Sequence, residues 1–135
     1  MSHWKVKSES NFNATNILNL ESFFTSSIHC SYYSCVQLMY HILSSHFNKS
    51  DFEISDDSFE GATKHKGMHA WIINMITNEI GGYSDGNQFA TIISDLQRLR
   101  IKSDYKNKHI SDKEADDARN YAVITRQILN RNFRT

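Results

Sequence analysis

The sequence predicts an all-helical fold, an up-and-down bundle of four long helices with a shorter fifth. Proline, the strongest helix breaker, is absent from all 135 residues. Apolar residues recur at spacings of three and four in five segments, and glycine, asparagine or short polar clusters separate these segments. Strands are hard to place anywhere in the chain.

The domain organisation is expected to be simple, with an N-terminal extension over residues 1–10 and one helical bundle over residues 11–133. The first helix is expected to run from about residue 11 to residue 24. The second, from about residue 27 to residue 47, has the clearest apolar stripe in the chain, and the stripe is wide. We therefore expect the second helix to lie at the centre of the bundle.

A polar, acidic stretch follows over residues 48–64, and we expect a loop there with a short turn between residues 52 and 59. Its carboxylates do not follow the ligand spacing of an EF-hand, so calcium binding is not expected. The third helix is expected over residues 67–80. Gly81 and Gly82 end it, because glycine readily adopts the left-handed conformation found at helix C-termini.

The last two helices have clear boundary signals. The fourth is expected to begin near residues 85–87 and to end around residues 103–106. Ser111 and Glu114 have the spacing of a capping box, in which each side chain binds a free backbone N–H group of the other residue. We therefore expect a final helix from this point to about Arg131.

Composition narrows the possible functions. Fifteen basic and fifteen acidic residues cancel, which argues against broad electrostatic capture of nucleic acid or anionic membrane. All six arginines lie at position 98 or later, so a local basic patch remains possible in the C-terminal third. No apolar run is long enough for a membrane span, and the N-terminus does not have the pattern of a secretory signal. Cys30 and Cys35 are too far apart on one helix for a disulfide, so we expect reduced thiols and a cytoplasmic location.

Three motifs, taken in order, resemble the HEPN domain family (higher eukaryote and prokaryote nucleotide-binding domains). The first is the paired tyrosine of Tyr32 and Tyr33 near the start of the second helix. The second is the polar segment 64–69 that opens the third helix. The third is Arg100 followed by Asp104 and Tyr105, and then a loop and an alanine-rich helix. The resemblance covers about residues 15–130.

The resemblance implies a helical bundle that pairs as a homodimer and works beside a nucleotidyltransferase-type protein in toxin–antitoxin or defence systems. Many such domains are metal-independent ribonucleases, whose signature is an arginine followed after four to six residues by a histidine. This chain departs from that signature. The only histidine that follows the first arginine, Arg98, is His109. Eight residues lie between Arg100 and His109, and ten lie between Arg98 and His109.

Four residues are the candidates for catalysis. Arg100 and Asp104 share a helix face and can form an ion pair that holds the helix end, which is the structural alternative. In the catalytic alternative Arg100 binds a phosphate, Asp104 and Tyr105 orient it, and His109 acts as general acid or base. Arginine suits phosphate because its planar fork donates two parallel hydrogen bonds.

Nucleotide or RNA binding has its own candidates, which are Tyr33, His69, Arg98 and Arg100. Adjacent helix positions diverge by about 100°, so we expect that Tyr32 and Tyr33 do not face the same partner. One is expected to pack inward with its hydroxyl satisfied near the Asp104 helix, and the other to face a dimer partner or a groove.

No metal or cofactor is expected. His65 and His69 have the spacing of a zinc pair, but no third ligand is evident, and Lys64 and Lys66 would repel a cation. An anion at this helix start fits better, because free backbone N–H groups gather there.

Three functions are therefore open. The first is a cytoplasmic, HEPN-like, dimeric protein that is non-catalytic or accessory and contacts RNA, a nucleotide or a nucleotidyltransferase partner. The second is a divergent metal-independent ribonuclease that uses Arg100, Asp104 and His109 across a dimer interface. The third is a plain helical interaction module.

Overall fold

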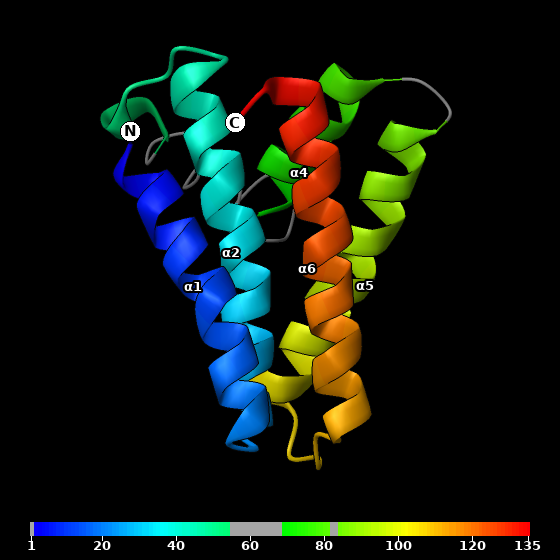
Figure 1. Ribbon diagram of the computed structural model, residues 1–135. Coiled ribbons are helices and arrows are strands. Elements are labelled where there is room, and N and C mark those ends of the chain that lie inside the picture. The colour runs from blue at the N-terminus through cyan, green and yellow to red at the C-terminus, as the bar shows by residue number, and fades with distance from the viewer. Residues whose placement is uncertain (1, 55–68, 82–83) are drawn as a thin grey trace.

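The computed structural model describes residues 2–54, 69–81 and 84–135, and these residues form helices without any strand. The helices are α1 (His3–Leu20), α2 (Phe24–Ser45), α4 (Ala70–Ile80), α5 (Asp85–Tyr105) and α6 (Asp112–Phe133). Residues 51–54 add a single helical turn. The long helices α1 and α5 run one way and α2 and α6 run the other, with the short α4 behind them (Figure 1). The expected all-helical bundle is confirmed for this part of the chain.

Helix α1 begins at His3, so the expected start at residue 11 is wrong. Residues 3–10, assigned from the sequence to an extension, are its first turns, and the Oγ of Ser2 caps it by accepting from the backbone N–H of Lys5. The fully buried residues of α1 are Ser8 and Thr15. Because the two completely buried positions of α1 hold hydroxyl residues, the helix has only a weak apolar stripe, and for this reason apolar periodicity did not find its beginning.

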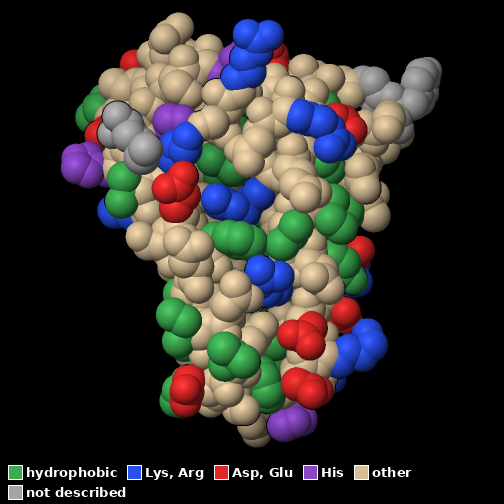
Figure 2. All heavy atoms as spheres, in the orientation of Figure 1, with side chains coloured by type: hydrophobic (Ala, Val, Ile, Leu, Met, Phe, Trp, Pro, Cys, Tyr) green, Lys and Arg blue, Asp and Glu red, His purple; other side chains and the backbone are tan. Residues whose placement is uncertain are grey.

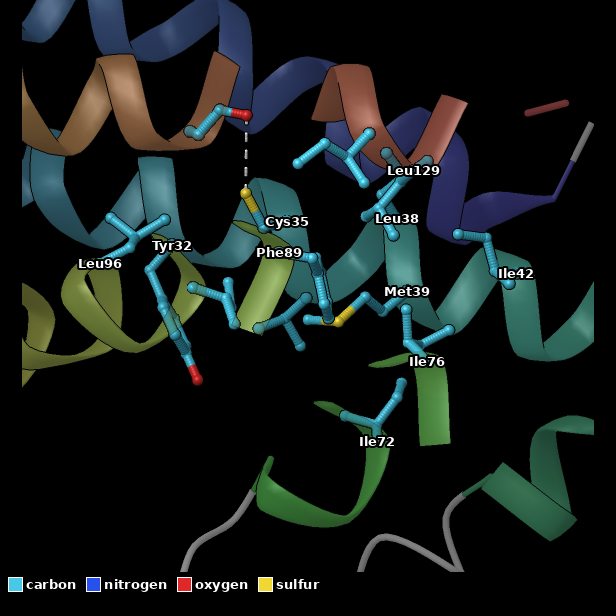
Figure 3. Close-up of a cluster of buried hydrophobic side chains, with 14 of the residues drawn as sticks. Tyr32, Cys35, Leu38, Met39, Ile42, Ile72, Ile76, Phe89, Leu96 and Leu129 are labelled. Carbon is cyan, nitrogen blue, oxygen red and sulfur yellow. Dashed lines mark hydrogen bonds between the residues drawn. The ribbon is translucent and has the colours of Figure 1, made fainter. Parts of the chain in front are cut away.

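Helix α2 is the central helix, as its wide stripe indicated. It contacts α1, α5 and α6, and eleven of its residues are buried. The core packs around it with side chains from α4, α5 and α6 (Figure 3). The completely buried large side chains of this core are Tyr32, Phe89, Ile28, Leu38, Met39, Ile42, Leu43, Ile72, Ile76, Ile93, Leu96 and Ile128.

Arginines join α6 to α1. Arg126 donates to the Ser8 hydroxyl and, at 3.3 Å, to the carbonyl of Ser34. Its guanidinium lies 4.8 Å from the ring centroid of Phe12, and that of Arg119 lies 5.4 Å from the same centroid. Figure 2 shows basic side chains set into the middle of the face that α1 and α6 form. Cation–π contacts and neutral acceptors therefore take the place of an apolar seam between these two helices.

The expected boundaries of the later helices are close to those observed. Gly81 ends α4 with a φ of 60°, which is the left-handed region that favours glycine. Helix α5 ends at Tyr105, and the capping box at Ser111 and Glu114 is present at the start of α6. Gly82 and most of the predicted loop, including its carboxylates after Glu53, lie outside the described residues. None of the described helices has the length and apolarity that crossing a bilayer requires.

Replacing Gly86 by alanine is expected to lower the free energy of unfolding by about 1–3 kcal/mol. A Cβ at this position would lie 2.7 Å from the backbone oxygen of Gly81, so the α4–α5 junction would have to move. This clash outweighs the gain in helix propensity from alanine, which is at most about 1 kcal/mol and is smaller in the first turn, where Gly86 lies. Urea unfolding measures the change. Thr91→Ala, an exposed site in the same helix, is the control, and a Gly86→Ala protein as stable as this control would contradict the close contact.

Candidate functional site

Arg100 lies on the inner face of α5, and three phenol rings surround its guanidinium. The guanidinium carbon is 5.3 Å from the ring centroid of Tyr32, 5.7 Å from that of Tyr33 and 5.3 Å from that of Tyr105. These distances are within the range of cation–π contacts. Arg100 is only 9% exposed, so α2 and the end of α5 together hold its charge in one place.

Polar contacts fix the guanidinium further. Its Nη2 donates to the hydroxyl of Tyr33 at 3.2 Å and to that of Tyr105 at 3.4 Å. Its Nε lies 3.2 Å from Oδ2 of Asp104, which is the ion pair expected from their spacing of four. The angle at Nε makes this contact an ion pair without a good hydrogen bond, because that buried N–H has no hydrogen-bond partner among the described residues.

The surroundings favour the charged form of Arg100. Burial by itself lowers its pKa, but the phenol groups of Tyr33, Tyr105 and Tyr32 and the carboxylate of Asp104 outweigh burial and raise it. The side chain therefore carries a permanent positive charge beside an aromatic surface. Of the three tyrosine rings around Arg100, that of Tyr105 is the most exposed to solvent, with 69% of the residue exposed.

Tyr32 and Tyr33 both contact Arg100, so the expectation that they face different partners is wrong. Their rings meet edge to face, with centroids 5.3 Å apart. The Cα–Cβ bonds of Tyr32 and Tyr33 point in different directions, but the side chain of Arg100 is long enough for its guanidinium to reach both rings from α5. Tyr32 is completely buried and points its hydroxyl away from the apolar core, as Figure 3 shows. The partner of that hydroxyl is His69, before α4, rather than a residue of α5.

His69 is 2% exposed, and its Nδ1 lies 2.6 Å from the Tyr32 hydroxyl oxygen. Burial, reinforced by the positive charge of Arg100, lowers the pKa of its imidazole to about 4. Burial also raises the pKa of the Tyr32 phenol, so both groups are neutral at neutral pH. The sequence placed His69 among the binding candidates, and in the structure its ring lies against the rings of both tyrosines.

His29 belongs to the same group of side chains, and sequence reasoning missed it. Its Nδ1 lies 3.4 Å from Oδ2 of Asp104, and its ring centroid is 4.5 Å from that of Tyr33. The signal was its position four residues before Tyr33, which places both rings on one face of α2. We call the seven side chains the Arg100 cluster, and they are His29, Tyr32, Tyr33, His69, Arg100, Asp104 and Tyr105.

Two candidates lie outside the Arg100 cluster. Arg98 points about 200° away from Arg100 around the helix, is largely exposed and pairs with Asp95. His109 is exposed in the link between α5 and α6 and joins none of the contacts described for the cluster. His65 falls outside the described residues. Within those residues, no three side chains of His, Cys, Asp or Glu are grouped as metal ligands.

Comparisons of the chain with models of protein families, with curated proteins and with solved structures find no match. The proposed function therefore depends on the chemistry of the Arg100 cluster.

Proposed function

We propose that this chain is an HEPN-like, cytoplasmic homodimer that binds RNA or a nucleotide through the Arg100 cluster without cleaving it. In this proposal it serves as an accessory component beside a nucleotidyltransferase-type partner. The observation that carries the proposal is the guanidinium of Arg100, held by three phenols next to the exposed rings of Tyr105 and His29.

The chemistry of the cluster suits a nucleotide. A guanidinium donates parallel hydrogen bonds to phosphate oxygens, and exposed aromatic rings accept stacked bases. Asp104 occupies part of the guanidinium fork in the free protein, and the same carboxylate oxygen, Oδ2, also lies 3.4 Å from Nδ1 of His29. An arriving phosphate can therefore displace the carboxylate of Asp104 from Arg100 and leave it next to His29.

Binding fits this site better than cleavage does. Metal-free cleavage of RNA requires a group that moves the proton of the 2′-hydroxyl, next to a cation that stabilises the phosphorane. His69 contacts Tyr32, as Arg100 does, yet it is buried with its Nδ1 bonded to the Tyr32 hydroxyl. A pKa of about 4 also makes it a weak base. The exposed His29 has its Nδ1 against Asp104.

Arg100→Lys is expected to weaken binding of a fluorescein-labelled single-stranded RNA by about ten- to a hundredfold. Lysine keeps the charge but loses the fork, and hydrogen bonds to charged groups contribute about 1.5–3 kcal/mol. Fluorescence anisotropy measures the affinity, with circular dichroism to verify that the helices remain. Arg98→Lys is the matched control on the same helix and is expected to bind as the unaltered protein does. Equal affinities for all three proteins would contradict the proposal.

The same proteins also test the ribonuclease alternative. Incubated with labelled RNA and a chelator, the unaltered protein is expected to leave the RNA intact. Cleavage that Arg100→Lys abolishes would establish the ribonuclease and overturn the non-catalytic assignment. Sedimentation as a monomer at every concentration would remove both the homodimer and any catalytic site shared between protomers.

A further inference from the structure

Aromatic rings continue from the Arg100 cluster along α2 to the start of α1. Tyr33 and Tyr40 are seven residues apart, so they lie on one face of α2 about 10 Å from each other. The His69 ring lies between them, with centroids 5.8 Å from Tyr33 and 6.4 Å from Tyr40. Beyond Tyr40, the ring of Trp4 follows at 4.8 Å. The rings thus connect the Arg100 cluster with the start of α1, which is distant from Arg100 in sequence.

This line of rings is partly open to solvent. Trp4, Tyr33 and Tyr40 are half-buried, whereas Tyr32 and Met39, their neighbours on α2, are completely buried. At the α1 end there is a cavity of about 470 Å³, whose lining includes Trp4, Lys7, Ser44 and Asp51. The indole of Trp4 therefore has a free surface next to an open volume.

A cation stands at each end of the line. Arg100 lies among the tyrosines at one end, and the Nζ of Lys7 lies 5.2 Å from the ring of Trp4 at the other. Asp51 accepts a hydrogen bond from the indole N–H at 3.4 Å, which orients the ring. Rings that accept stacked bases, together with cations that meet phosphates, are the chemistry with which proteins hold single-stranded nucleic acid.

We propose that Trp4, Tyr40 and Lys7 extend the Arg100 cluster into one binding stripe for single-stranded RNA. This inference rests on the proposed function and specifies its ligand as a strand of several nucleotides rather than a free nucleotide. The distance between Tyr33 and Tyr40 alone equals about three stacked nucleotides at ~3.4 Å each. A dinucleotide bound at Arg100 therefore does not reach Trp4, whereas an octamer does.

Tryptophan fluorescence can report on the far end of the stripe directly. The chain has two tryptophans, and Trp71→Phe leaves Trp4 as the only one. In that protein, a uridine octamer is expected to quench the fluorescence of Trp4, whereas a uridine dinucleotide binds without quenching it. An octamer that binds without changing this fluorescence would overturn the stripe.

Affinities of the two RNAs separate the stripe from the Arg100 cluster. Trp4→Ala is expected to weaken octamer binding roughly tenfold, because stacking on an aromatic ring is lost, and to leave dinucleotide binding unchanged. Trp4→Phe keeps a ring and is expected to retain most of the affinity. Phe23→Ala removes an aromatic ring that is 60% exposed at the other end of α2 and is expected to change neither RNA's affinity.

Lys7→Gln is a second variant, chosen because this side chain is exposed and glutamine removes its charge while it keeps a polar side chain. It is expected to reduce the slope of log affinity against log salt by about 0.7 for the octamer, which is the value for one phosphate contact on a single strand. The slope for the dinucleotide is expected to stay the same.

The failures of the two proposals are distinguishable. If Arg100→Lys weakens both RNAs while the Trp4 and Lys7 variants bind the octamer normally, the stripe is wrong and the proposed function stands. Equal weakening of dinucleotide and octamer by Trp4→Ala would show that Trp4 acts through folding and would overturn the stripe. Normal binding by the Arg100, Trp4 and Lys7 variants would end both proposals.

Discussion

Stability is expected to fall by about 3 kcal/mol between pH 6.5 and pH 4, because the folded protein keeps His69 neutral. Its imidazole has a pKa of about 4 in the folded state against an ordinary value of 6.5. The unfolded chain therefore binds a proton in this window that the folded chain does not. Each pH unit counts for about 1.4 kcal/mol. The contribution is complete above pH 6.5, is lost as the pH falls to about 4, and does not change further below that value.

Urea unfolding of the protein and of His69→Gln at several values between pH 7 and pH 4 measures this effect. Glutamine can still bond to the Tyr32 hydroxyl but does not titrate, so the variant is expected to lose much less stability on acidification. The ion pair of Asp85 and Arg131 does not interfere, because its hydrogen bonds lower the pKa of Asp85 to about 2 from 3.8, below this window. Parallel pH profiles for the two proteins would contradict a buried, neutral His69.

Phe89→Ala is expected to lower the free energy of unfolding by about 3–5 kcal/mol. Phe89 is completely buried in α5 and lies in the middle of the core near Cys35 and Met39 (Figure 3). Alanine would remove most of this side chain and leave a cavity that the rigid α2 cannot fill. Domains of this size are stable by only about 5–15 kcal/mol in total, so the loss is a large share.

Urea unfolding at pH 7 gives the measurement, and Phe52→Ala is the matched control. Phe52 is 80% exposed, so its truncation is expected to change stability by less than about 0.5 kcal/mol. If the two variants lose similar amounts, Phe89 is not in the core and the packing of α5 against α2 is wrong.

Local signals were sufficient wherever a feature depends on residues three or four positions apart. The capping box of Ser111 and Glu114, the end of α4 at Gly81 and the Arg100–Asp104 pair all follow from such spacings, and the structure contains each of them. The inward residues of α1 carried no such signal. Hydroxyl side chains such as Ser8 pack inward only because Ser34 of α2 offers an acceptor, and that partner is 26 residues away.

By itself, the sequence determined that the chain forms amphipathic helices and that Arg100 shares a helix face with Asp104, because both depend on the helical repeat. Only the tertiary structure decided that Arg100 contacts the rings of both Tyr32 and Tyr33, and that His69 is buried against Tyr32. These contacts join residues 67 and 37 positions apart. They exist because the packing of α5 and the start of α4 onto α2 sets where long side chains meet, and no pattern within a single helix contains that information.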